Sequence, residues 1–276
     1  MIIVKTQGGL GNQLFQYACG RAVALRRNVE LRVWDGPRDV VNRPDRPLRL
    51  WDFTVTATPG SEEDVAQATH IVYENPFGFL PEVLHSPDGI LLDGFWQSEH
   101  YFIDAADKIR SELSFRDAGI MQRARMAVAV FRQKAGVPVV AVHIRRGDYV
   151  LERTKGIFHV LSLNWFRVAM ARFPKDVLFL VFSDDLPWCR ANLHDPRVHY
   201  AAGESDLADF ALMRACDHYI ISNSTYSWWG AWLSDNASPV VIGPEPSIWF
   251  GPVLTALGRH DASNILPSRW IAQPEI

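Results

Sequence analysis

The sequence predicts an α/β protein, and three observations favour this fold class. Short runs of β-branched and apolar residues, typical of buried strands in a parallel sheet, alternate with segments of helical periodicity. Several of these runs end abruptly in polar residues, as strands do where open α/β sheets bind their ligands. A glycine-rich loop also lies between the first strand and the first helix. We therefore expect two Rossmann-like halves that face a central cleft.

The first half alternates only in part. Its predicted strands are residues 2–6, 30–34 and 89–95. Its predicted helices are residues 12–27, 98–113 and 117–135. Asn12 is the expected N-cap of the first helix. The weakly periodic residues 36–87, rich in Pro, Asp and Arg, are predicted as loops with short elements.

The second half alternates more regularly. Its predicted strands are residues 137–144, 177–182, 218–221 and 239–242. Its predicted helices are residues 163–173, 186–192, 205–215 and 225–233. Strands and helices in this order predict right-handed βαβ units and a parallel sheet. With the break near residues 115–137, we expect an N-terminal domain over residues 1–130 and a C-terminal domain over residues 131–276.

Composition limits the classes of function. The 276 residues carry a net charge of -3, which gives no general basic field for nucleic acid, so any anion site must be local. The three cysteines form no CxxC or metal pattern, which favours a reducing, cytoplasmic compartment. The first residues are expected to form a core strand rather than a signal peptide, and no apolar run has the length of a membrane span.

The first candidate site is the glycine loop, comprising Gly8, Gly9, Gly11, Asn12 and Gln13. Glycines let backbone amides approach an anion, and the start of the following helix adds a favourable dipole. The loop is neither a Walker motif nor a complete GxGxxG, because no Lys-Ser or Lys-Thr follows it and Leu14 replaces the third glycine. A tight turn without a ligand is an equally good interpretation.

The second candidate site follows the strand 137–144 and contains His143, Arg145, Arg146 and Asp148. Two guanidiniums at a strand end offer planar, permanently charged donors for phosphate or carboxylate. The alternative is a structural ion-pair network that caps the strand.

Two further strands end in polar residues. Ser183, Asp184 and Asp185 follow one of them, and Asp185 is also a good N-cap. The other strand precedes a hydroxyl- and amide-rich helix start, with Ser222, Asn223, Ser224, Thr225 and Ser227, which suits an uncharged diphosphate site. The alternative is again capping, with Trp228 and Trp229 in the core. Three such strand ends along one sheet edge predict a nucleotide-diphosphate site in which arginines replace a metal.

These motifs resemble one known family. Residues 8–18, GGLGNQLFQYA, are similar to the N-terminal signature of the bacterial α-1,2-fucosyltransferases, inverting glycosyltransferases of family 11. Residues 143–149, HIRRGDY, resemble their HxRRGDY motif, and residues 97–102, 182–185 and 221–229 resemble further blocks. The blocks stand in the family's order and span nearly the whole chain. Residues 156–165 depart from the family's tyrosine-containing pattern, which bears on the placement of the acceptor.

The resemblance implies a GT-B fold, with GDP-fucose held mainly by the second domain and the acceptor by the first. It implies transfer with inversion to an α-1,2 linkage on a galactose-like sugar, with no cofactor and no obligatory metal. His143 and a carboxylate of the Asp184–Asp185 pair would contact guanosine. Ser224, Thr225 and Ser227 would contact the diphosphate, and Gly9 and Gly11 the phosphate or fucose. A bacterial polysaccharide precursor is the implied acceptor, and peripheral attachment to the inner face of the membrane stays open.

Two residues are assigned to catalysis. Arg145 is expected to stabilise charge on the leaving diphosphate, with Arg146 either sharing the phosphate or pairing with Asp148. Asp148 is the first choice for the general base, and Glu99, His100 and His159 are alternatives on the acceptor side. Two other functions remain open: a glycosyltransferase with a different nucleotide-sugar donor, and a non-catalytic nucleotide- or carbohydrate-binding protein.

Overall fold

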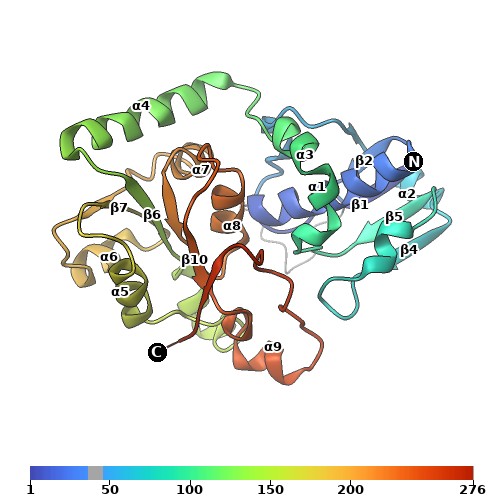
Figure 1. The fold of residues 1–276 in the computed structure, drawn as a ribbon. Coiled ribbons are helices and arrows are strands. Elements are labelled where there is room, and N and C mark those ends of the chain that lie inside the picture. Colours follow the sequence, from blue (N-terminus) through green and yellow to red (C-terminus); the bar gives the residue numbers. More distant parts are fainter. Residues whose placement is uncertain (37–45, 276) are drawn as a thin grey trace. The chain divides into compact units, whose positions relative to one another are not determined.

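The computed structural model describes residues 1–36 and 46–275 and divides the chain into two compact units (Figure 1). The N-terminal unit contains Met1–Asp117 and Arg259–Pro267, and the C-terminal unit contains Ala118–Gly258 and Ser268–Ile276. The division therefore comes before the expected boundary at residue 130, because the helix 118–135 belongs to the C-terminal unit. Residues 259–267 also return to the N-terminal unit, so the two units are not separated by one boundary as expected.

The N-terminal unit is built on a parallel five-stranded sheet in the order β3-β2-β1-β5-β4. Its strands are β1 (Ile2–Lys5), β2 (Leu31–Trp34), β3 (Thr58–Pro59), β4 (His70–Tyr73) and β5 (Ile90–Asp93). Its α-helices are α1 (Leu10–Arg27), α2 (Glu62–Ala66) and α3 (Ala106–Glu112). Strand β1 lies at the centre with Ile2, Ile3 and Val4 fully buried, so the glycine loop leaves the middle of the sheet.

The C-terminal unit has a parallel six-stranded sheet in the order β11-β10-β9-β6-β7-β8. Its strands are β6 (Val139–Ile144), β7 (Leu178–Ser183), β8 (Val198–Tyr200), β9 (His218–Ile220), β10 (Val241–Pro244) and β11 (Ile271–Gln273). Its helices are α4 (Ala118–Ala135), α5 (Leu163–Ala171), α6 (Leu186–Asn192), α7 (Asp206–Arg214), α8 (Thr225–Trp232) and α9 (Pro252–Ala256). Parallel sheets in both units confirm the predicted α/β class; the central cleft between them stays a prediction.

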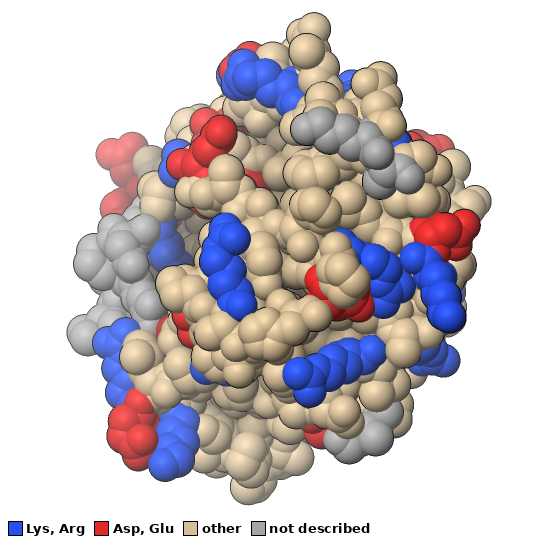
Figure 2. Space-filling view, turned by 90° about the vertical axis from the view of Figure 1, so that its left-hand side faces the viewer, with Lys and Arg blue, Asp and Glu red and all other residues tan. Residues whose placement is uncertain are grey.

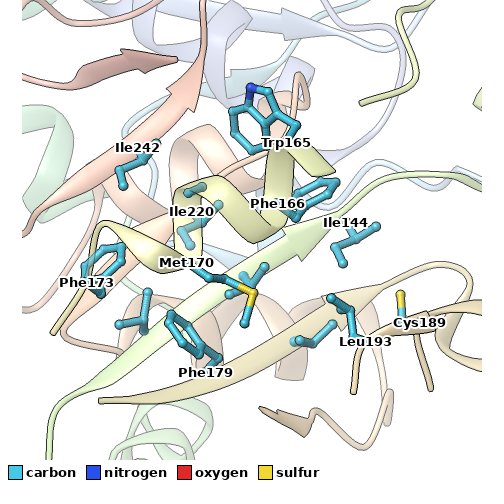
Figure 3. Packing of buried hydrophobic residues seen from close by; sticks show 14 of the residues in the cluster. Ile144, Trp165, Phe166, Met170, Phe173, Phe179, Cys189, Leu193, Ile220 and Ile242 are labelled. Carbon is cyan, nitrogen blue, oxygen red and sulfur yellow. The ribbon is translucent and has the colours of Figure 1, made fainter. Parts of the chain in front are cut away.

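The core of the C-terminal unit holds β6 and β7 in place. Helix α5 packs Trp165, Phe166 and Met170 onto the sheet, beside Phe179 of β7 and Ile144 of β6 (Figure 3). Helix α8 adds a second aromatic group, in which Trp228 and Trp229 are fully buried with ring centroids 5.1 Å apart. Replacing one such ring by Ala typically lowers the free energy of unfolding by about 3–5 kcal/mol. The strands whose ends carry the candidate site therefore belong to a well-packed core.

Several sequence expectations are wrong in detail. Gly9, not Asn12, is the N-cap of α1, because the Gly9 carbonyl already accepts from the amides of Asn12 and Gln13. The predicted helix 98–113 breaks into two 3-10 turns, η3 (Glu99–Tyr101) and η4 (Ile103–Ala105), before α3. The expectation of loops with short elements over residues 36–87 is confirmed in its described part, which contains β3, α2 and β4; residues 37–45 lie outside the described part of the chain.

No helix within residues 1–36 and 46–275 is long and apolar enough to cross a membrane. The described cysteines, Cys19, Cys189 and Cys216, are all buried and unpaired.

Candidate active site

The three polar strand ends of the C-terminal unit lie side by side, as predicted. Strand β6 is hydrogen-bonded to β7 on one side and to β9 on the other. The register pairs His143 with Phe182 and Ile144 with Ser183, so β6 and β7 end at the same level. The segments after the three strands therefore share one edge of one sheet.

His143, at the end of β6, is a buried neutral imidazole. Its Nδ1 atom lies 2.7 Å from the Ser222 hydroxyl oxygen, which follows β9. Burial lowers the pKa of His143 to about 4; the Asp184 carboxylate opposes this shift and the Arg145 guanidinium adds to it. At neutral pH the ring thus takes part in hydrogen bonds and carries no charge.

Arg145 is held between two carboxylates. One of its terminal nitrogens lies 2.8 Å from Oδ2 of Asp184, and the other donates to Oδ1 of Asp148. Burial would lower the pKa of Arg145, but the Asp184 and Asp148 carboxylates more than offset it. The guanidinium is therefore a fixed cation. Of the two alternatives for Arg146, the pairing with Asp148 is wrong, because the 3-10 turn η5 (Gly147–Val150) returns Asp148 to Arg145.

Arg146 is held by the first turn of α6. Its guanidinium carbon lies 3.7 Å from the ring centroid of Trp188, and its Nε donates to Asp185 at 3.1 Å. Asp185 also caps α6 by accepting from the Trp188 amide at 3.2 Å, which confirms its predicted capping role. A cation over an indole face gains about 0.5–2 kcal/mol, which helps to keep this guanidinium in one orientation. Trp188 was not among the predicted site residues.

Asp184 links both arginines, and Gly147 makes room for it. Its Oδ1 accepts from the Arg146 amide at 2.9 Å while its Oδ2 pairs with Arg145. A Cβ atom on Gly147 would lie 2.3 Å from the same Oδ2. Glycine is needed here for this close approach.

The carboxylates outnumber the guanidiniums in this cluster. Two arginines and three aspartates give a formal sum of +2 - 3 = -1. The structural ion-pair interpretation is thus confirmed. It is compatible with anion binding, because a guanidinium has five N–H donors and each carboxylate engages only one or two of them.

On the face in Figure 2, the described basic side chains lie interspersed with acidic ones and form no single-sign patch.

At the third strand end, two predicted ligands are internal. The Asn223 side-chain amide donates to the carbonyls of His159 at 2.9 Å and Trp249 at 2.8 Å, and Asn223 is buried. Ser227 is fully buried, and its hydroxyl donates to the Ser224 carbonyl at 3.2 Å. Both donors are therefore used by the protein's own main chain: Asn223 connects two other segments, and Ser227 bonds within the first turn of α8. Their contact with the donor stays a prediction. Ser224 is the N-cap of α8 and makes no side-chain capping bond; Thr225 is its first residue.

The glycine loop of the N-terminal unit is also tied internally. Gly8 has a left-handed backbone (φ 77°), which favours glycine. Gln13 is buried and donates to the carbonyls of Gly8 and Pro47 at 3.0 and 3.1 Å, so its side-chain amide is used within the protein and its ligand role stays a prediction. Gly11 is buried within α1. Gly9 and Asn12 are partly exposed and remain candidates.

The three acceptor-side candidates belong to two different units. Glu99 is buried in η3, and His100 is exposed, with its ring centroid 5.2 Å from that of Phe79. His159 belongs to the C-terminal unit, where its Nε2 lies 3.2 Å from the Glu275 carboxylate. Among the residues that the structure describes, no group of three or more His, Cys, Asp or Glu side chains is placed to hold a metal ion. Catalysis without a metal stays a prediction.

The comparisons identify one family. The family model described as glycosyl transferase family 11 matches residues 86–247. An α-1,2-colitosyltransferase of Escherichia coli is 30% identical, over 91% of this chain and 92% of the relative. The E. coli O-antigen biosynthesis glycosyltransferase WbnK is 28% identical over 96% and 97%. A galactoside α-(1,2)-fucosyltransferase 1 of Sus scrofa is 34% identical over 52% of this chain and 42% of its own length.

Solved structures support the fold. The fucosyltransferase NodZ from Bradyrhizobium has a TM-score of 0.51 at 16% identity, over 89% of this chain and 95% of NodZ. A mutant of Arabidopsis thaliana FUT1 in complex with GDP has a TM-score of 0.50 at 12% identity, over 91% and 73%. These likenesses confirm the expected two-domain GT-B type.

We predict that Gly147→Ala destabilises the C-terminal unit. The added methyl group forces Asp184 away from Arg145, and overpacking of this kind costs roughly 1–3 kcal/mol. Thermal denaturation measures the loss. Gly136→Ala is the control, since its Cβ meets no atom within 4 Å and reports only the cost of a left-handed alanine. A midpoint unchanged from wild type in Gly147→Ala contradicts the prediction.

We predict that His143 makes the protein less stable in acid. Its pKa is about 4 in the folded protein, against 6.5 for a solvated histidine, so between these values the unfolded chain binds more protons. Stability should fall as the pH drops from 6.5 towards 4. Below pH 4, His143 should cause no further change in stability. Asn can keep the hydrogen bond to Ser222 but does not titrate. Melting curves across this range should therefore show a smaller acid loss for His143→Asn; equal losses would refute the assignment.

Proposed function

Because the chain belongs to glycosyltransferase family 11, we propose that it is an inverting fucosyltransferase that moves L-fucose from GDP-fucose to O2 of a terminal galactose-like sugar. The observation that carries this proposal is the fixed Arg145 guanidinium at the carboxyl end of β6, between Asp148 and Asp184. The relatives named α-1,2-colitosyl- and α-(1,2)-fucosyltransferases support the linkage.

The proposed reaction is a substitution at the anomeric carbon. The acceptor O2 forms a bond to C1 of fucose from the face opposite GDP, while the bond from C1 to the β-phosphate oxygen breaks. The ring passes through an oxocarbenium-like state, and negative charge develops on the departing oxygen. A guanidinium that is already oriented stabilises that charge without reorganising, which lowers the barrier rather than only tightening donor binding. The acceptor proton leaves to a base or to solvent.

Asp148 fits a positioning role better than the base role expected from the sequence. Its carboxylate accepts from Arg145, and its side chain is only 10% exposed. A base must instead reach the acceptor hydroxyl within about 3 Å. We therefore assign Asp148, together with Asp184, to the orientation of Arg145.

Arg146, Trp188 and His143 line the same sheet edge and complete the proposed donor site. Arg146 keeps a fixed orientation on Trp188, which suits a second contact with the diphosphate. His143 offers a neutral ring nitrogen for the nucleoside, in line with the family resemblance. The carboxylates of Asp184 and Asp185 each accept a hydrogen bond from an arginine already. A contact of either carboxylate with guanosine would therefore use an oxygen lone pair that is not engaged in these bonds.

A second candidate donor carries colitose, which is fucose without its 3-hydroxyl group. The 30% identity with an α-1,2-colitosyltransferase favours it. The similarity to an O-antigen biosynthesis glycosyltransferase supports a bacterial surface polysaccharide precursor as the acceptor in either case.

The donor is tested by measuring release of the nucleoside diphosphate, GDP from GDP-fucose or GDP-colitose and UDP from UDP-galactose, each with a panel of β-galactosides. We expect transfer from a GDP-sugar but not from UDP-galactose, and we expect GDP but not UDP to raise the midpoint of thermal denaturation. A preference for GDP-colitose would select the second candidate. Tight GDP binding without transfer to any acceptor would favour a non-catalytic binding protein.

We predict that Arg145→Ala lowers kcat by at least ~10²-fold, the usual cost of losing one contact to developing charge. The exposed Arg172, changed to Ala, is the matched control and should leave turnover unchanged. Near-normal turnover of Arg145→Ala would remove this mechanism while leaving the family assignment intact.

A further inference from the structure

The carboxyl edge of the N-terminal sheet holds a carboxylate that the proposed function does not use. Glu74 directly follows β4, and its amide donates to the Asp93 carbonyl at the end of β5 at 3.1 Å. It is only partly exposed, and burial raises its pKa to about 7 against the hydrogen bonds that it accepts. A partly buried carboxyl group with a raised pKa often has a structural or functional role.

Both oxygens of Glu74 bind the turn after β5. One accepts from the amides of Phe95 at 2.6 Å and Trp96 at 3.2 Å, and the other also accepts from the Trp96 amide at 3.2 Å. The turn fits closely around this carboxylate, since a Cβ on Gly94 would lie 2.5 Å from the Cβ of Glu74. With both oxygens engaged, the geometry suits anchoring rather than proton transfer.

The anchored turn is strained at Trp96. This residue is fully buried and has φ 56°, a left-handed conformation that costs a bulky side chain about 1–3 kcal/mol. Such a conformation persists only where its surroundings hold it, and the two bonds from the Trp96 amide to Glu74 do so.

The same turn is connected to the glycine loop by two side-chain amides. Gln16 donates to the Gly94 carbonyl at 3.1 Å and accepts from the Gln7 amide at 3.0 Å. Gln97, the residue after Trp96, donates to the Asn12 side-chain oxygen at 3.1 Å. These hydrogen bonds connect residues 94–97 to both ends of the loop 7–12.

We propose that Glu74 is a positioning residue that, by anchoring the strained turn 94–97, sets the shape of the glycine loop 7–12 for its contact with the donor sugar. The contact with the donor rests on the proposed function; the mechanical coupling does not. Glu74 acts through Gln16 and Gln97 and touches no substrate itself.

Glu74→Gln tests the coupling. Glutamine keeps the size of the side chain, but one carboxylate oxygen becomes an NH₂ group, which cannot accept from the Trp96 amide. We expect hydrogen exchange to become up to about tenfold faster at the Trp96 amide and also in residues 7–12, as the loss of such a bond implies. Glu63→Gln, an exposed glutamate of the same unit, is the control. Faster exchange confined to residues 94–97 would overturn the proposal.

Kinetics then test the link to the reaction. Glu74→Gln should lower kcat by about tenfold while the Kd for GDP stays within twofold of wild type, because the Arg145 site is untouched. If the substitution is only destabilising, Kd and kcat change together with the folded fraction, and the proposal is wrong. If wild type transfers no sugar, the proposed function fails while the exchange result still decides the coupling. Glu74→Asp, which keeps the charge, should restore part of the protection in residues 7–12.

Discussion

The candidate site depends on one carboxylate, that of Asp184. It accepts from the Arg146 backbone with one oxygen and from the Arg145 side chain with the other, so it fixes the segment after β6 by its main chain and its cation at once. The interaction exists because β7 lies beside β6 in register and because Gly147 leaves room for the carboxylate. Without it, Arg145 would keep Asp148, a neighbour on the short turn that follows it, and the Tyr149 ring, whose centroid lies 5.4 Å from its guanidinium carbon.

This arrangement reconciles two interpretations of the arginine cluster. An ion-pair network and an anion site look like alternatives in the sequence, but in the proposed mechanism the first prepares the second. Carboxylates that hold a guanidinium in one orientation cost affinity for a diphosphate, since the cluster already has a formal charge of -1. The same carboxylates offset this loss of affinity in the transition state, because a guanidinium that is already oriented stabilises the developing charge without a reorganisation cost. Trp188 and Asp185 do the same for Arg146 from the first turn of α6.

The sequence predicts the sheet positions of the site well, and for a physical reason. Buried parallel strands are long apolar runs, so their ends are visible wherever polar residues begin, as at His143, Ser183 and Ser222. The segments beyond the strand ends are less predictable. Asp148 reaches Arg145 because a 3-10 turn folds the chain back, and no spacing rule distinguishes this from a pairing with Arg146.

Residue type also fails to show which way a polar group faces. Gln13, Asn223 and Ser227 suit a ligand and suit the protein's own main chain equally well, and the structure turns all three inward. Strand β4 was not predicted because His70, Ile71 and Tyr73 are exposed on a short edge strand and show no buried face. The role of Glu74 was hidden with it, since the residue matters only once β4 is placed beside β5.

A double-mutant cycle in kcat distinguishes whether Asp184 acts on the reaction through Arg145, as we propose, or independently of it. If it acts through Arg145, Asp184→Asn slows the wild-type enzyme by at least about tenfold but has little further effect in an Arg145→Ala background, because residues that act as one unit are not additive. If the two losses instead multiply, Asp184 acts independently of Arg145, and its assigned role in orienting that guanidinium is wrong.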